Sequence, residues 1–187
     1  LFNNYAILLG EKGDFKEALA MITKALSLDT NYAQAYSARA QIRFFLQDID
    51  SACIDKTKSI DLGYLEAFNI PEIVCNGTKS IKMKYTADIF AKNKLFDQAI
   101  SLYTLLIENT VDSSDYHLNR GYCYYSIKDY SKAESDYLKA LKLPNPAVNL
   151  LYSNLSLLYF DQNIFEKSIE LDKNIPLIVL GNYNHAN

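Results

Sequence analysis

The chain has 187 residues, a formal net charge of −3, and a composition that is 49% hydrophobic. It therefore has enough apolar side chains for a core, and its slight negative charge argues against a nucleic-acid-binding surface, which is usually basic. No stretch approaches the roughly 18 continuous apolar residues that a membrane-spanning helix needs.

The chain begins with Leu1, and this residue already fits the pattern of a first helix. We therefore expect a fragment, a processed product or a partly ordered chain, in which any targeting signal or lipid-anchored cysteine upstream would not be visible. The compartment stays open between the cytoplasm and the periplasm, and a disulfide between Cys53 and Cys75 would favour the periplasm.

A short pattern recurs along the chain, in which a bulky residue is followed three positions later by a small one. The small residues are Ala18, Ala52, Ala99, Ala133 and Ser168. A second set of small residues lies twelve positions before them, at Ala6, Ala40, Ala87, Gly121 and Ser156. A period near 34 residues predicts stacked helical hairpins, in which small residues allow the two helices to approach closely.

The turns within the predicted hairpins support this organisation. Asp14, Asp48 and Asp129 each precede a predicted second helix, where Asp can accept a backbone N–H as an N-cap. Glu17 follows Asp14 by three residues, which predicts an approximate capping box there.

An insertion follows the second hairpin. Residues 63–69 predict a short extra helix that Pro71 ends, and the insertion closes near residue 75. We therefore predict two domains, residues 1–75 and residues 76–187. The joint between them could be a hinge or a packed kink, and its apolar content favours the kink. Near the C-terminus, residues 177–180 form a short apolar run that we expect to pack elsewhere or to lead into further chain.

The segment from Tyr116 to Pro144 has a small residue in its first helix, an aromatic-x-x-Ala start to its second helix and an Ala-Leu-x-Leu-Pro exit. It resembles the tetratricopeptide repeat family, and the resemblance covers nearly the whole chain. The second hairpin, with Cys53 and a Gly63-Tyr64 pair, is similar to repeats common in Bacteroidetes proteins. The family resemblance implies an all-α solenoid of about five helical hairpins, wound as a right-handed superhelix.

The same resemblance implies a concave groove lined by first helices. Its expected residues are Gln41, Phe44, Phe45, Lys84, Asp88, Leu118, Tyr122, Tyr125, Leu157 and Phe160. We expect a non-enzymatic scaffold that binds a peptide or protein partner there, because aromatic anchors give contact area at low entropic cost. Some of these rings could instead pack against the next hairpin, and of Phe44 and Phe45 one should lie in the core and one should be exposed.

Two alternatives of a different class remain. The chain could be a regulatory or sensory segment of a larger multidomain protein, or an accessory subunit of an envelope or secretion assembly. Heat-shock chaperone tails are not expected as partners. Lys84 and Asn119 match the carboxylate-binding positions of chaperone adaptors, but Asp88, Leu150 and Asn154 do not.

The sequence contains no recognisable catalytic, cofactor or metal motif, so no enzyme activity, cofactor or metal is expected. Three cysteines are present. Cys53 and Cys75 are far enough apart to form a disulfide across one turn-back of the chain, although two free thiols are the alternative. Cys123 lies within a predicted first helix and is interpreted as a small buried residue.

Overall fold

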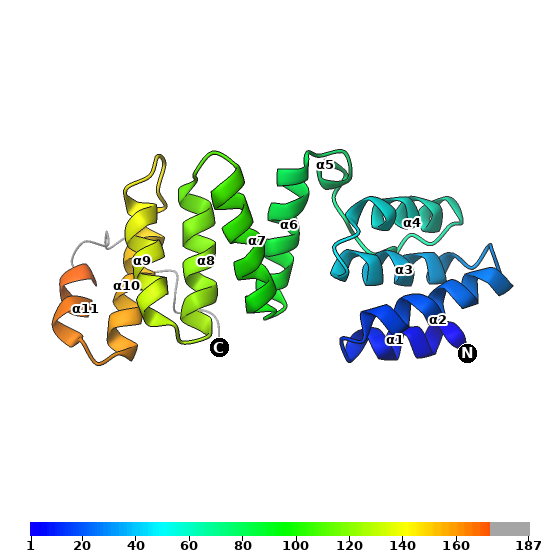
Figure 1. Ribbon diagram of the computed structural model, residues 1–187, viewed down its shortest axis with the longest axis horizontal. Coiled ribbons are helices and arrows are strands. Elements are labelled where there is room, and N and C mark those ends of the chain that lie inside the picture. The colour runs from blue at the N-terminus through cyan, green and yellow to red at the C-terminus, as the bar shows by residue number, and fades with distance from the viewer. Residues whose placement is uncertain (173–187) are drawn as a thin grey trace. The chain divides into compact units, whose positions relative to one another are not determined.

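The computed structural model describes residues 1–172, and within that range it consists of helices and turns, with no strand (Figure 1). The helices are α1 (Phe2–Glu11), α2 (Phe15–Leu28), α3 (Ala33–Phe45), α4 (Ile49–Asp61), α5 (Glu72–Cys75), α6 (Lys79–Lys92), α7 (Phe96–Asn109), α8 (Ser114–Ser126), α9 (Tyr130–Leu141), α10 (Val148–Asp161) and α11 (Phe165–Asp172). The predicted all-α repeat fold is confirmed, whereas the handedness of the superhelix stays a prediction. The predicted apolar run at residues 177–180 lies outside the described residues.

The chain divides into two compact units, Leu1–Lys82 and Met83–Asn187, and the boundary falls inside α6. Helices α1 to α4 form two hairpins in the first unit, and α7 to α11 form the rest of the second unit together with most of α6 (Figure 1). The predicted domain boundary after residue 75 stays a prediction.

Each hairpin is closed where a small residue of the first helix meets a small residue of the second. Seven of these residues are completely buried: Ala6, Ala18, Ala40, Ala52, Ala87, Ala99 and Ala133. Large side chains fill the space beside them, so that Ile22, Tyr103 and Tyr137 are also at most 1% exposed. The small residues therefore set how closely the two backbones pack, and the large ones fill the core around them.

The turn inside each hairpin uses the same backbone conformation. Five residues at the equivalent position have a positive φ: Gly13, Gln47, Lys94, Lys128 and Asn163. After this residue, Asp48 and Asp129 cap the next helix by accepting backbone N–H bonds from Ser51 and Lys132, both at 3.3 Å. Asp14 occupies the N-cap position of α2 but makes no side-chain capping bond, so the predicted capping box is not formed.

The predicted helix at residues 63–69 is wrong, because the chain forms turns there and the short helix α5 starts only after Pro71. Proline fixes φ near the helical value and lacks an N–H, so it suits the start of a helix as well as its end. Pro71, at φ −56°, occupies the N-cap position of α5.

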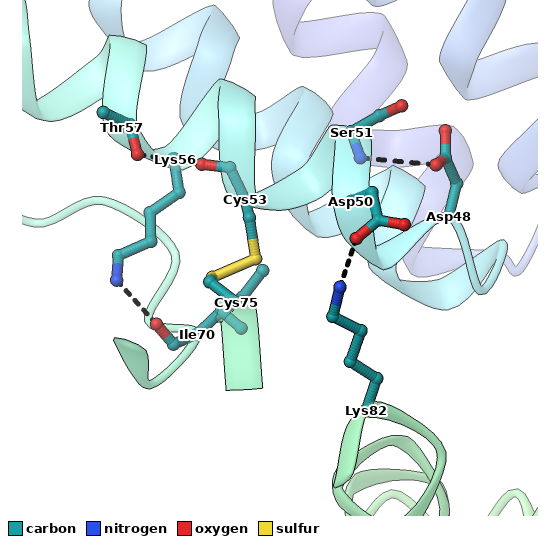
Figure 2. Close-up of a disulfide and its surroundings, with 9 residues drawn as sticks. All are labelled: Asp48, Asp50, Ser51, Cys53, Lys56, Thr57, Ile70, Cys75 and Lys82. Carbon is teal, nitrogen blue, oxygen red and sulfur yellow. Dashed lines mark hydrogen bonds and ion pairs between the residues drawn. A yellow bond between two sulfur atoms is a disulfide. The ribbon is translucent and has the colours of Figure 1, made fainter. Parts of the chain in front are cut away.

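The insertion is packed onto the first unit by several contacts. Ile70 and Val74 are 0% and 3% exposed. The Lys56 ammonium donates to the Ile70 carbonyl oxygen at 2.6 Å, and the Phe68 N–H donates to Ser37 Oγ at 2.8 Å. Figure 2 shows Cys53 of α4 joined to Cys75 of α5 by a disulfide, with the two Cα atoms 5.7 Å apart. The bridge therefore fastens the end of the insertion to α4.

Gly121 tests whether the close contact between the two helices of a hairpin requires a small residue. A Cβ at this position would lie 2.8 Å from the buried Tyr137 ring, whereas a Cβ at Gly10 would meet nothing nearer than Ile42 Cγ1 at 4.0 Å. We expect Gly121→Ala to lower the free energy of unfolding by about 1 kcal/mol, because overpacking outweighs the gain in helix propensity. Gly10→Ala should raise it by roughly the same amount. Urea denaturation followed by circular dichroism measures both changes, and equal stabilisation by the two variants would contradict this requirement.

The disulfide predicts a dependence of stability on the redox state. We expect the Cys53→Ser, Cys75→Ser double variant to lose about 3 kcal/mol of unfolding free energy, since the bridge restricts the unfolded chain. A reductant should cause the same loss in the wild-type protein and no loss in the double variant. Under denaturing conditions the unreduced protein should expose the thiol of Cys123 alone, and titration of all three thiols without reductant would contradict the bridge.

Candidate functional site

The first unit has a hollow of about 260 Å³ between the first helices of its two hairpins. Its lining residues are Ile7, Gly10, Glu11, Phe15, Ala38, Gln41, Ile42 and Phe45. The Phe15 and Phe45 rings are stacked, with centroids 5.0 Å apart and planes 8° from parallel. Two of the predicted groove residues, Gln41 and Phe45, therefore meet in one concave surface that α1, α3 and the start of α2 form.

The second unit has a larger hollow, of about 540 Å³, between α6 and α8. It is lined by Asp88, Ala91, Lys92, Lys94, Phe96, Tyr103, Asn119 and Tyr122. Phe96 at the start of α7 contacts Tyr122 of α8 with ring centroids 6.3 Å apart. Tyr122 is 48% exposed, so its ring is partly available to solvent.

The two hollows occupy the same place in the repeat. Counted from the small residue of each first helix, Ile7 corresponds to Asp88, and Glu11 corresponds to Lys92. Phe15 and Phe96 likewise stand three residues before the small residue of their second helices. The same backbone geometry thus produces a similar hollow in each unit, while the side chains that line it differ in charge.

The charge of Asp88 is engaged inside the second unit. Its carboxylate accepts hydrogen bonds from the Lys84 ammonium at 2.9 Å and from the Tyr103 hydroxyl at 2.6 Å. Lys84 also pairs with Asp115 at 3.0 Å. Burial lowers the pKa of Lys84, but the bonds to the two carboxylates outweigh it and the net pKa is raised. Lys84 therefore stays protonated, and its charge is shared by the carboxylates of Asp88 and Asp115.

Three further predicted groove residues lie on α8 and α10. Tyr125 donates its hydroxyl to Asp161 at 2.5 Å, and burial together with this bond raises the pKa of Tyr125 to about 12. Leu157 and Phe160 are 48% and 56% exposed. The Phe160 ring contacts that of Phe165 in α11, with centroids 5.6 Å apart. Exposed apolar surface thus continues along the first helix of the last hairpin.

Two of the predicted groove residues are core residues. Phe44 is completely buried and packs against Phe68 of the insertion, with ring centroids 5.5 Å apart. Leu118 is 7% exposed and belongs to the cluster around Tyr137 and Leu155. Neither side chain is open to a partner. Phe45 is the more exposed of the adjacent phenylalanines, because successive side chains on a helix point about 100° apart.

Sequence reasoning missed a buried ion pair that recurs in two hairpins. Arg39 binds both carboxylate oxygens of Asp55 at 2.7 Å, and Arg120 binds both oxygens of Asp136 at 2.8 Å. Each arginine directly precedes the small residue of its first helix, and each aspartate follows the alanine of its second helix by three positions. The recurring Arg-small and Ala-x-x-Asp spacings were the signal that could have revealed the pair.

Each buried carboxylate also contacts a nitrogen of a second side chain. Arg43 Nη1 lies 2.6 Å from Asp55, and His117 Nδ1 lies 2.9 Å from Asp136. The other ring nitrogen of His117 lies 2.9 Å from Asp112. The carboxylates of Asp55 and Asp136 are buried between the two helices of a hairpin, and neither lines a hollow, so we interpret these pairs as holding the two helices in register.

The pair predicts a specific pattern of stability loss. Asp136→Asn should lower the free energy of unfolding by about 3 kcal/mol, because the mostly buried Arg120 loses its ionic partner. The double replacement Arg120→Met, Asp136→Leu should lose clearly less, since no unpaired charge remains. Chemical denaturation measures both variants. A double variant that is less stable than Asp136→Asn would contradict this account.

Within residues 1–172, no three or more His, Cys, Asp and Glu side chains are grouped so that they could hold a metal ion. The helices of this same range are also too short or too polar to cross a bilayer. The buried thiol of Cys123 has its pKa raised to about 12, mainly by burial, so it remains protonated.

Comparison with protein families identifies two segments of the chain. Two family models, each described as a tetratricopeptide repeat, match residues 1–32 and residues 114–143. The first match covers the α1–α2 hairpin, and the second covers the α8–α9 hairpin. A search of curated proteins finds no matching sequence.

Several solved structures are similar to the chain. YrrB, described as a TPR protein with an unusual peptide-binding site, is 18% identical with a TM-score of 0.47, and the alignment covers 91% of this chain and 80% of YrrB. MamA from Desulfovibrio magneticus RS-1, from residue 41 to its end, is 13% identical with a TM-score of 0.49, and the alignment covers 100% of this chain and 96% of the MamA chain. PilF from Pseudomonas aeruginosa is 14% identical with a TM-score of 0.45, and the alignment covers 91% of this chain and 71% of the PilF chain. The fold assignment rests on the observed hairpins and the two repeat matches.

Proposed function

We propose that this chain, two segments of which match tetratricopeptide-repeat models, is a protein–protein interaction scaffold that binds a peptide or protein in the hollows between the first helices of each unit. The observation that carries this proposal is the hollow that recurs at the same repeat position in both units. Repeat proteins commonly use concave surfaces of this kind for binding.

The chemistry of the two hollows supports binding of an extended or helical peptide. Each hollow contains one aromatic contact between neighbouring hairpins, Phe15 with Phe45 in the first unit and Phe96 with Tyr122 in the second. Aromatic side chains in such positions bring large contact area with few rotatable bonds, and they are common binding hot spots. Polar neighbours such as Gln41 and Asn119 can fix the register of a bound backbone.

The regulatory and assembly roles expected as alternatives stay predictions, as does the absence of enzyme activity. Proteins of this repeat class act in general as interaction scaffolds. The residues around the hollows likewise offer contact surface and hydrogen-bonding groups, which is the chemistry of recognition.

An array of peptides of varied composition, probed with the purified 187-residue chain, tests the proposal. We expect the double variant Phe45→Ala, Tyr122→Ala to bind the retained peptides at least about tenfold more weakly, because one aromatic anchor is removed from each hollow. Titration of the best peptides by fluorescence anisotropy gives the affinities.

The matched control is the double variant Leu105→Ala, Leu138→Ala. These leucines are 43% and 41% exposed, close to the 48% of Tyr122, but they lie on the second helices α7 and α9 and line neither hollow. This variant should keep wild-type affinity, and both variants should keep wild-type helicity. Equal weakening by the two double variants would refute the assignment of binding to the first helices.

A further inference from the structure

The hollow of the second unit has an excess of positive charge at its rim. Lys92 at the end of α6 and Lys94 in the following turn are both exposed and both line the hollow. Neither ammonium group is paired with a carboxylate in the part of the chain that the structure describes. The carboxylate of Asp88, which also lines this hollow, is already bonded to the Tyr103 hydroxyl and to Lys84, which it shares with Asp115, so the two exposed lysines still leave a net positive charge here. The two exposed lysines are therefore the charges left for a ligand.

The floor beside these lysines is apolar and aromatic. Ala91, Phe96 and the exposed part of Tyr122 form it, and Phe96 and Tyr122 are in contact. A ligand that satisfied the whole hollow would thus carry a negative charge next to an aromatic or aliphatic group. A purely polar anion would leave the floor uncovered, and a purely apolar ligand would leave the lysines without a partner.

We propose that this hollow selects an acidic peptide segment, in which a Glu or Asp side chain pairs with Lys92 and Lys94 while a neighbouring apolar side chain packs on Phe96 and Tyr122. The proposal rests on the proposed scaffold function and adds the chemical class of the partner. Both lysines are flexible and solvated, so they contribute selectivity and faster association more than affinity.

The first unit provides an internal comparison, because its equivalent hollow lacks the positive rim. Glu11 stands where the second unit has Lys92, Gly13 stands where it has Lys94, and Ile7 replaces Asp88. The aromatic contact is retained there by Phe15 and Phe45. The preference for an acidic segment should therefore belong to the second hollow alone.

Two fluorescein-labelled peptide pools test this inference with the full chain. Both contain one Phe at the centre of an otherwise randomised peptide; one pool has Glu on each side of the Phe, and the other has Gln. We expect the wild-type protein to bind the Glu pool about tenfold more tightly in fluorescence anisotropy. This preference should largely disappear in about 1 M salt, where the Debye length is about 3 Å.

Charge variants locate the effect. The double variant Lys92→Glu, Lys94→Glu should lose the preference for the Glu pool and bind the Gln pool with wild-type affinity. The matched control is the double variant Lys128→Glu, Lys142→Glu, which makes the same change in net charge at two exposed lysines that line neither hollow, and it should keep the wild-type ratio of the two affinities. A change of this ratio in the control as large as that in the Lys92→Glu, Lys94→Glu variant would overturn the placement in the second hollow.

The other outcomes separate this inference from the function on which it rests. Equal affinity of the wild-type protein for both pools would overturn the acidic class and leave the scaffold function intact. Failure to bind either pool would also overturn it, while binding on the varied peptide array would still support a scaffold. If the array were blank as well, both proposals would fail together.

Discussion

The close approach of two helices at a pair of small residues is the constraint on which the rest of this chain depends. At Gly121 the Tyr137 ring of the facing helix leaves no room for even one added carbon, and in the other hairpins buried alanines, or Ser156 and Ser168 in the last one, take that place. Once the backbones are held this closely, large side chains can fill the core beside them, and within each unit the first helices of neighbouring hairpins leave a hollow between them. The recurring hollow is a result of that spacing.

The sequence predicted the parts of the fold that depend on periodicity. It was less successful where the packing of separate segments decides whether a side chain is buried or whether a segment forms a helix. Small residues at fixed spacing identify hairpins because a close helix contact tolerates few other side chains. The outcome for Phe44 and Leu118 could not be predicted in the same way: each stands at a groove position, but the insertion covers Phe44, and neighbouring helices cover Leu118. The helix expected at residues 63–69 failed for a related reason, since tertiary contacts of Phe68 and Ile70 hold that segment in turns.

Charged side chains in this chain fall into two groups, which differ in whether the charge is buried and paired or exposed to water. Asp55 and Asp136 are enclosed between helices, and each is bound on both oxygens by an arginine, so they serve the structure. Lys92 and Lys94 remain in water at the rim of a hollow, where a charge costs little to keep and can still interact with an approaching ligand. Composition alone cannot separate these groups, because both contribute to the same small net charge. Only the spacing of arginine and aspartate relative to the small residues distinguishes them.

The repetition of one hollow in two separately packed units has a consequence for how such a protein can diverge. The fifth residue after the small anchor is glutamate in the first helix of one unit and lysine in that of the other, and both side chains are exposed. A change at this position therefore reverses the sign of the charge at the rim of one hollow without disturbing any buried contact. On the proposed scaffold function, selection can change the charge preference of one hollow by single substitutions while the other hollow keeps its own, so a new partner can be gained before an old one is lost.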